Sequence, residues 1–226
     1  MTRTETDRAA ITPSVLLLNP NSSVAVTNAI VAVVETFGDI PVDIRVDQID
    51  EGPETIESAE DHEKVLPLIL RRIEIASEDV VIVACHGDPG VKQARVPGGP
   101  RILGIGESSM LVACAAGGNF GVITLSNGLV TRKLRQVEQY GLSDRCAGVV
   151  ASGTGVLHGL REDPDIQPYV EAGRELARLG ATSIILGCAG MVRVQSAVQS
   201  ELNCMVIDPV KAAIGLVLGI PVYGRR

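Results

Sequence analysis

The chain has 226 residues, of which 46% are hydrophobic and only 2% aromatic, and its formal net charge at pH 7 is −7. This length and this apolar fraction predict a globular protein, either one compact unit or two half-domains that share a cleft. The negative charge, the absence of a Lys/Arg cluster and the scarcity of aromatic side chains for stacking argue against nucleic acid as a partner and favour a small molecule.

The cysteines and the start of the chain indicate the compartment. The five cysteines include no Cys-x-x-Cys pair, so neither a disulfide framework nor a zinc ribbon is predicted, and reduced thiols are expected. No apolar run reaches the length of a membrane span, and residues 1–10 are polar and of mixed charge, unlike a secretory signal. We therefore expect a cytoplasmic protein that does not enter a membrane and holds no metal.

Short β-branched runs alternate with longer segments of helical period along the chain, which is typical of α/β units built on a mainly parallel sheet. Strands are expected at residues 15–18, 42–46, 80–84, 102–105, 121–125, 148–151, 183–186 and 205–207. Helices are expected at residues 22–37, 59–76, 108–116, 129–140, 167–179, 192–202 and 210–218.

An internal repeat relates the two halves of the chain. The segments "DVVIVACHGDPG" and "TSIILGCAGMVR" each run from an apolar strand through a cysteine, Cys85 or Cys188, into a turn. The segments that follow the two cysteines have the same spacing, because Arg101 is as many residues after Cys85 as Cys204 is after Cys188. The preceding pieces, "LLLNPNSS" and "VITLSNG", correspond more loosely. One α/β half has therefore been used twice.

The repeat predicts where the ligand binds. Parallel α/β sheets bind ligands at the carboxyl ends of their strands, and Asn19, Cys85, Ser126 and Cys188 all follow predicted strands. If the two halves face each other across a pseudo-twofold axis, Cys85 and Cys188 oppose each other over one cleft.

Two thiols on opposite sides of a carbon next to a carbonyl suit racemisation without a cofactor. One cysteine, as thiolate, removes the proton from this carbon, and the other, as thiol, delivers a proton to the opposite face. A free cysteine has a pKa of about 8.5, so the thiolate needs a stabilising environment such as a helix N-terminus. The turns after both cysteines, with "NPNSS" and "LSNG", supply N–H groups, amides and hydroxyls for the thiolate and for the developing enolate.

Five motifs in chain order, "LLLNPNSS", "VACHGDPG", "GIGESS", "LGCAGM" and "VIDPVKAA", resemble those of hydantoin and allantoin racemases, a branch of the aspartate/glutamate racemase superfamily. The resemblance covers residues 15–218. It implies a two-lobed α/β fold, a two-cysteine mechanism without a cofactor, and 5-substituted hydantoins or allantoin as substrates. Carried over to this chain, Cys85 and Cys188 are the acid/base pair. The candidate substrate-binding residues are Asn19, His86, Gly87, Thr124, Ser126, Ala189 and Gly190.

We therefore expect an α/β fold with two similar parallel-sheet, flavodoxin-like lobes, related by pseudo-twofold symmetry, and an active-site cleft between them. Residues 1–107 plus 208–226 are expected to form the first lobe, and residues 108–207 the second. A homo-oligomer is expected, but no residue pattern indicates how many copies it contains.

Departures from the superfamily bear on the substrate. Acidic-amino-acid racemases have an early Asp-Ser motif where this chain has "NPNSS", which makes glutamate and aspartate poorer candidates. His86 stands where hydantoin racemases more often have an apolar or aromatic residue, so the preference for the substrate's side chain stays open. The alternatives are another member of the superfamily, a cis–trans isomerase of an unsaturated diacid, a non-catalytic small-molecule binder and a thiol redox sensor. The isomerase ranks lower because the quoted motifs contain few basic residues.

Structural roles are expected for several other reactive residues. Asp88 and Asp208 each precede a proline in a pattern typical of a helix N-cap. His62 lies on a charged helix face, where a solvated side chain is expected. Adjacent residues of an extended chain point to opposite sides, so Cys85 and His86 are not expected to chelate a metal. The cysteines without a matching partner in the repeat are interpreted as structural, namely Cys114, Cys146 and Cys204.

Overall fold

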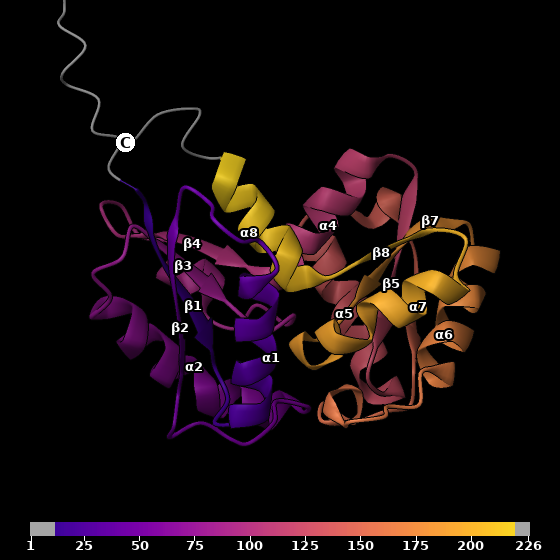
Figure 1. Cartoon of the computed structure of the whole chain (residues 1–226), viewed down its shortest axis with the longest axis horizontal. Coiled ribbons are helices and arrows are strands. Elements are labelled where there is room, and N and C mark those ends of the chain that lie inside the picture. Colours follow the sequence, from indigo (N-terminus) through magenta and orange to yellow (C-terminus); the bar gives the residue numbers. More distant parts are fainter. Residues whose placement is uncertain (1–11, 220–226) are drawn as a thin grey trace, which may run out of the picture.

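Two lobes, each built on a four-stranded parallel sheet, make up residues 12–219, which the computed structural model describes (Figure 1). The first sheet has the order β2-β1-β3-β4 and contains β1 (Ser14–Asn19), β2 (Asp43–Gln48), β3 (Val80–Val83) and β4 (Arg101–Gly104). The second has the order β6-β5-β7-β8 and contains β5 (Asn119–Thr124), β6 (Cys146–Ala151), β7 (Ala181–Leu186) and β8 (Met205–Ile207). All neighbouring strands are parallel, so the duplicated α/β half is confirmed, with β3 and β7 as equivalent strands.

Helices connect the strands and cover the sheets. In the first half of the chain they are α1 (Val24–Glu35), α2 (Ala59–Glu74), α3 (Val91–Ala94) and α4 (Ile105–Ala116). In the second half they are α5 (Asn127–Gln139), α6 (Gln167–Arg178), α7 (Gln195–Glu201) and α8 (Pro209–Gly219). Short 3-10 helices occur at Ser143–Arg145 (η2), His158–Leu160 (η3) and Ala189–Val194 (η4). Every helix expected from the sequence is present.

The predicted boundaries differ from the observed ones by up to three residues, and two of these differences have a common cause. The strand expected at residues 102–105 ends at Gly104, and Ile105 already begins α4. The helix expected at residues 192–202 starts as the 3-10 helix η4, and only Gln195–Glu201 is α-helical. In both places the chain changes conformation without a break in the pattern of apolar residues, so their spacing does not mark the transition.

The core joins the two lobes. Residues 15–18 of β1 are 0% exposed, and alternate residues point to opposite faces of the sheet. Leu17 and Ile82 of the first sheet belong to the same hydrophobic cluster as Ile184 and Leu186 of the second. Because one apolar cluster runs through both lobes, the strand ends that carry the site are held in a fixed mutual position.

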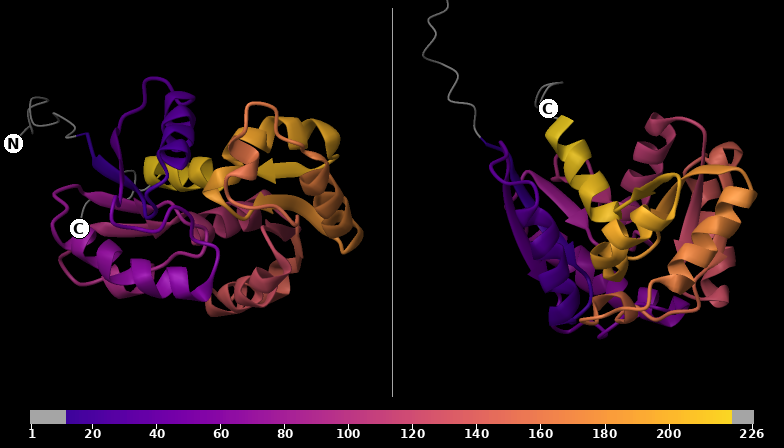
Figure 2. Two further views of the ribbon diagram at one scale, coloured as in Figure 1. Left: turned by 90° about the horizontal axis from the view of Figure 1, so that it is seen from below. Right: turned by 45° about the vertical axis from the view of Figure 1, so that its right-hand side comes forward.

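Helices α4 and α8 pack against each other between the lobes (Figures 1 and 2). Helix α4 also contacts β5 and β7 of the second sheet, whereas α8 contacts α1 of the first lobe. The division of the chain into residues 1–107 plus 208–226 and residues 108–207 stays a prediction, and residues 1–11 and 220–226 lie outside the described part.

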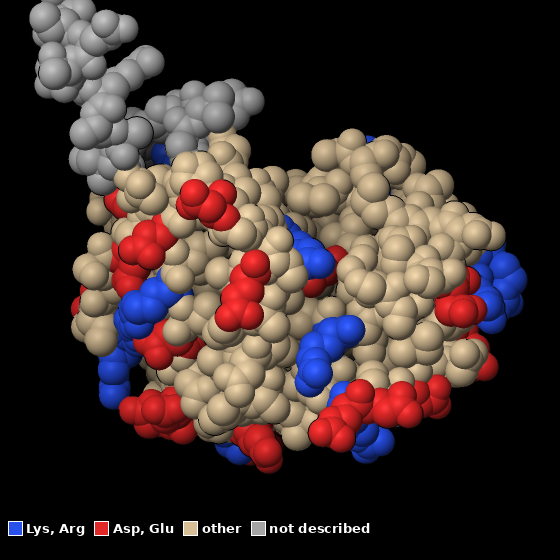
Figure 3. All heavy atoms as spheres, in the orientation of Figure 1, with Lys and Arg blue, Asp and Glu red and all other residues tan. Residues whose placement is uncertain are grey.

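The surface carries charges of both signs. On the face shown in Figure 3, acidic and basic side chains are interspersed over both lobes rather than gathered into one large basic area. Nucleic-acid phosphates need such a basic area, so this face is not suited to them. Between residues 12 and 219, no helix combines the length and the apolar character needed to cross a bilayer.

Candidate active site

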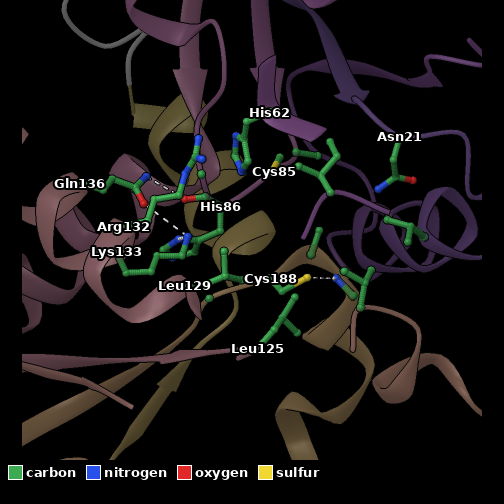
Figure 4. Close-up of a pocket in the computed structure, with 18 residues that line it drawn as sticks. Asn21, His62, Cys85, His86, Leu125, Leu129, Arg132, Lys133, Gln136 and Cys188 are labelled. Atoms are coloured by element: carbon green, nitrogen blue, oxygen red, sulfur yellow. Dashed lines mark hydrogen bonds between the residues drawn. The ribbon is translucent and has the colours of Figure 1, made fainter. Parts of the chain in front are cut away.

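Cys85 and Cys188 line one pocket between the lobes (Figure 4). Cys85 follows β3 after one residue, Ala84, and Cys188 follows β7 after Gly187. The carboxyl ends of two equivalent strands therefore bring two thiols to the same cavity.

Each cysteine sulfur accepts a hydrogen bond from a backbone N–H two residues later. Gly190 donates to Cys188 Sγ at 3.3 Å, where Cys188 is the N-cap of η4. The N–H group of Gly87 makes the corresponding hydrogen bond to Cys85. Because an N–H group stabilises a thiolate more than a thiol, both positions favour ionisation relative to an equally buried cysteine without this contact.

The charges around the two thiols differ. Burial raises the pKa of Cys85, while its hydrogen-bonded N–H group and the positive charges of Lys133 and Arg132 act to lower this pKa. Burial is the main cause that raises the pKa of Cys188 to about 12; the charge of an ionised Cys85 acts in the same direction, and the charge of Lys133 acts against it. Cys85 is therefore the thiol with more groups that favour ionisation.

The His86 ring is buried in a directed chain of hydrogen bonds. Burial, followed by the charge of Lys133, lowers the pKa of His86 well below its usual value, so the ring is neutral. Lys133 Nζ donates to His86 Nδ1 at 2.7 Å, which assigns the ring proton to Nε2, 3.3 Å from Ser109 Oγ. Ser109 Oγ donates to the carbonyl oxygen of Gly106 at 2.8 Å. Both ring nitrogens of His86 are therefore engaged within the protein.

Lys133 extends from α5 and is buried against the pocket. Its ammonium group donates to Gln136 Oε1 at 3.3 Å as well as to His86 Nδ1. Both acceptors are neutral, because one belongs to an amide and the other to an uncharged imidazole ring. Burial lowers the pKa of Lys133 to about 8, and the negative charges of an ionised Cys85, of Asp88 and of an ionised Cys188 act in the opposite direction. An anion that forms in the pocket therefore favours the charged form of Lys133.

Asp88 ties the Cys85 loop to the second lobe. Its Oδ1 accepts from the N–H group of Gly106 at 2.9 Å and its Oδ2 from that of Glu107 at 2.7 Å, so the carboxylate caps α4. Oδ2 also accepts from Gln136 Nε2 at 3.1 Å and from Tyr140 Oη at 2.7 Å. Both carboxylate oxygens are therefore used as acceptors at the junction of α4, α5 and the loop.

The two aspartates that precede prolines differ in the position of the helix that each one caps. The prediction that Asp88 caps the helix directly after it is wrong, because Asp88 has a φ of 48° and Gly90 is the N-cap of α3. Asp208 does cap its own helix, since Oδ1 accepts from the N–H groups of Val210 at 2.8 Å and Lys211 at 3.1 Å. Asp208 Oδ2 is buried without a partner in the described structure, and burial raises the pKa of Asp208 to about 6.

His62 is buried beside the Cys85 loop, so the expectation of a solvated side chain is wrong. It lies on the buried stripe of α2 with Val65 and Ile69, although its sequence neighbours are charged. A Cβ atom at Gly87 would lie 2.2 Å from His62 Cε1, so only glycine allows the ring to approach here. Burial lowers the pKa of His62 to about 4, and the ring is neutral.

Three predicted binding residues do not line the pocket. Asn19 is fully buried, and its Nδ2 donates to Asn21 Oδ1 and Thr27 Oγ1, both at 3.0 Å. Thr124 is also fully buried, whereas Ser126 is exposed at the start of α5. The predicted residues that do line the pocket are Cys85, His86, Gly87, Cys188, Ala189 and Gly190.

Helix α5 contributes residues that sequence reasoning missed. Leu129, Lys133 and Gln136 follow one another at helical spacing, and all three line the pocket with Arg132. A lysine and a glutamine on the buried stripe of an amphipathic helix are the signal that could have identified them, because such residues are rarely buried without a functional or pairing reason. The other unpredicted polar lining residues are Asn21 and His62.

Comparisons with known proteins agree over nearly the whole described chain. The family model Asp/Glu/Hydantoin racemase matches residues 15–217. A hydantoin racemase from Pseudomonas sp. (strain NS671) is 30% identical over 222 residues, which cover 93% of this chain and 86% of the relative. One from Rhizobium meliloti is 31% identical, covering 88% of this chain and 84% of the relative. The structure of allantoin racemase from Klebsiella pneumoniae matches with a TM-score of 0.82 at 26% identity, covering 94% and 89% of the two chains.

Proposed function

The chain belongs to the Asp/Glu/Hydantoin racemase family and is a racemase, and we propose that it inverts C5 of a 5-substituted hydantoin or of allantoin by proton transfer between Cys85 and Cys188. One observation carries the proposal. Two thiols from equivalent strands of a duplicated fold line one pocket, and each accepts an N–H hydrogen bond from the residue two positions later.

The reaction moves one proton off C5 and another onto it. For one enantiomer, the Cys85 thiolate removes the C5 proton, and the electron pair of the C–H bond moves into the adjacent carbonyl to give an enolate. The Cys188 thiol then delivers its proton to the opposite face of C5, which leaves Cys188 as the thiolate. The opposite enantiomer uses the same groups in reverse order, so no cofactor is consumed.

The surroundings of the cysteines support this division of roles. Burial raises the pKa of both thiols, that of Cys188 to about 12. The charge of Lys133 opposes this rise at both thiols, and the charge of Arg132 opposes it in addition at Cys85. An acid and a base must differ in protonation state at the same pH, and unequal environments provide that difference. We therefore assign Cys85 as the base in the first half-reaction.

The test follows the C5 proton. Each enantiomer of a hydantoin, and of allantoin, is incubated with the protein in heavy water while optical rotation and the C5 proton signal in NMR are recorded. Loss of rotation with deuterium gained at C5 is the expected result. Cys85→Ser and Cys188→Ser should each lose racemisation by at least about a thousandfold, since a serine hydroxyl is a far weaker acid than a thiol.

Cys114→Ser is the matched control, because Cys114 is also a free, partly buried thiol but does not line the pocket. Its racemisation rate should equal that of the unchanged protein. Normal racemisation by either single-cysteine variant would refute the two-base scheme. Exchange of one enantiomer without inversion by such a variant would instead support it, since one base then remains on one face.

A second candidate is the cis–trans isomerisation of an unsaturated diacid. Arg132 and Lys133 favour it, because their positive charges line the pocket and could bind carboxylates. In this reaction a cysteine thiolate adds to the double bond, the resulting single bond rotates, and elimination restores the thiolate. Mass spectrometry of the protein mixed with a cis diacid should then detect an adduct on one cysteine, whereas a racemase gives none.

A further inference from the structure

One end of the pocket is rich in nitrogen atoms. Arg132, Lys133 and His62 point toward this end from α5 and α2, on the opposite side of the cavity from Asn21 (Figure 4). The rest of the lining is largely apolar, with Val26, Ile56, Leu125 and Val156 among its members. The pocket is thus polarised between a basic end and an apolar remainder.

Two of these groups are cations without an acidic partner in the pocket. None of the described residues that line the cavity is acidic. Among the described residues, Lys133 Nζ donates only to the neutral acceptors His86 Nδ1 and Gln136 Oε1. Arg132 forms no hydrogen bond or ion pair with any other residue between 12 and 219.

The neighbouring groups give Lys133 some negative charge, from Asp88 and an ionised Cys85, but none of them contacts Arg132. His62 is neutral, since burial lowers its pKa to about 4. Asp88 lies behind the Cys85 loop, where its two oxygens accept four hydrogen bonds, from Gly106, Glu107, Gln136 and Tyr140. A cation without a counterion in a partly desolvated site, as Arg132 is, is unfavourable, so the site gains free energy when a ligand brings an anion.

The proposed substrate class does not by itself meet this need. A hydantoin ring is a neutral arrangement of two carbonyl and two N–H groups, and its ring would occupy the space between the cysteines. Its C5 substituent is the part that can extend away from them. A planar guanidinium binds a carboxylate through two parallel hydrogen bonds, which a lysine cannot do.

We propose that the preferred substrate is a hydantoin whose C5 substituent ends in a carboxylate, and that Arg132 binds this carboxylate at the basic end of the pocket. This inference rests on the proposed hydantoin racemase function and specifies its substrate. Lys133 adds positive charge at the same end of the cavity. Carboxymethyl and carboxyethyl substituents are the simplest members of this class.

The experiment compares substrates that differ in charge but hardly in shape. The 5-carboxymethyl and 5-carboxyethyl hydantoins are paired with their carboxamides, and kcat/KM for deuterium uptake at C5 is measured for each. The unchanged protein should prefer the acid of each pair by at least about tenfold, which is typical of one charge-assisted contact. Arg132→Gln should reduce this acid-to-amide ratio by about ten- to a hundredfold.

Arg135→Gln is the matched control. Arg135 lies on the same helix, is exposed and does not line the pocket, so this variant removes the same charge from α5 without touching the cavity. Its acid-to-amide ratio should equal that of the unchanged protein. An effect of Arg135→Gln as large as that of Arg132→Gln would mean that general charge, and not binding, sets the ratio.

Each outcome separates this inference from the proposed function. Equal rates for acids and amides, or an equal loss of both in Arg132→Gln, would overturn the carboxylate site and leave the racemase standing. If no hydantoin exchanges its C5 proton, the proposed function fails. Calorimetric titration of the same four compounds then still decides the inference, because tighter binding of acids that depends on Arg132 supports the site and equal binding overturns it.

Discussion

The two cysteine loops occupy equivalent places in the duplicated fold but are held by different forces. After β3, the loop that carries Cys85 is fixed to the second lobe by polar contacts, including those of Asp88 and a hydrogen bond of 2.7 Å from Gln136 Nε2 to the carbonyl oxygen of His86. After β7, the chain past Cys188 forms η4, where Met191 and Val194 are buried in an apolar cluster.

This difference shows what duplication preserves and what it leaves free. Strand order, the position of the cysteine and its N–H hydrogen bond recur in both halves, because they follow from backbone geometry. The charged partners do not recur, since Lys133 and Arg132 come from one helix of the second lobe and gather at one end of the pocket. A symmetric backbone thus carries two thiols in unequal surroundings, which suits the proposed proton transfer between them.

The largest expected effect concerns the charge of Lys133. Its pKa in the folded protein is about 8, below the usual 10.5, so the folded state binds fewer protons than the unfolded state between these pH values. The stability contribution of Lys133 should therefore rise with pH across this window, by about 3 kcal/mol in total.

Urea denaturation at pH 7 and pH 10.5 gives the free energy of unfolding of two variants, Cys85→Ser and the double variant Cys85→Ser/Lys133→Met. The change with pH in the difference between these two free energies measures the contribution of Lys133. The Cys85→Ser background removes the titration of the neighbouring thiol. Lys92→Met in the same background is the control, because Lys92 is exposed and does not line the pocket. A difference that does not change with pH would mean that Lys133 is not desolvated in the folded protein.

Asp88 should matter nearly as much to stability. In Asp88→Asn, an amide replaces one of two oxygens that both accept hydrogen bonds, so at least one N–H or O–H donor at the α4–α5 junction loses its acceptor. We expect the free energy of unfolding to fall by about 2 kcal/mol, and the racemisation rate to fall with it as the Cys85 loop shifts. Urea denaturation and the heavy-water assay measure the two effects, and an unchanged stability would contradict the acceptor role.

The acidity difference between the thiols should appear in their chemical reactivity. At pH 7.5, iodoacetamide should modify Cys85 faster than Cys188 by about tenfold or more, because the thiolate is the nucleophile and the pKa of Cys188 is raised to about 12. Peptide mass spectrometry over time measures both rates in one sample. Cys188→Ser and Cys85→Ser then test each thiol alone, and a faster Cys188 would reverse the assignment of the base.

The smallest effect is expected at Asp208, the other aspartate that caps a helix. Asp208 uses Oδ1 to accept from two N–H groups and leaves Oδ2 without a partner in the described structure. Asp208→Asn can keep the accepting oxygen in place and removes a buried charge, so stability should change by no more than about 0.5 kcal/mol at pH 7. A loss of unfolding free energy as large as that of Asp88→Asn would mean that both oxygens of Asp208 contribute to stability, as those of Asp88 do.

Sequence patterns predicted the parts of the site that backbone geometry determines. The two cysteines and the residues directly after them line the pocket because they follow strand ends, and apolar runs followed by turns predict where strands end. Asn19 also follows a strand, but its side chain points into the protein and orients Asn21, which lines the pocket in its place. Position along a strand predicts proximity to the site, whereas the direction of one side chain depends on local hydrogen bonds.

The parts that could not be predicted come from helices of the opposite lobe. Lys133 reaches His86, next to Cys85, only because α5 is placed against the Cys85 loop, and no spacing in the chain relates Lys133 to this loop. The charged sequence neighbours of His62 predict a solvated side chain, yet the helix places this residue on its buried face with Val65. Tertiary packing decides such contacts, and a local pattern contains no information about the partner.

Helix α8 has a consequence for the order in which the protein can be made. It is the last element that the structure describes, but its residues Val210, Ile214 and Val217 share an apolar cluster with Val26 and Ile30 of α1. Domains generally fold from the N-terminal end during synthesis. Here the first sheet leaves the ribosome early, while the helix that covers part of α1 arrives only after the second lobe has been translated. A nascent chain that stops before residue 209 would expose this apolar face to chaperones, so the first lobe is completed only after α8 has been synthesised.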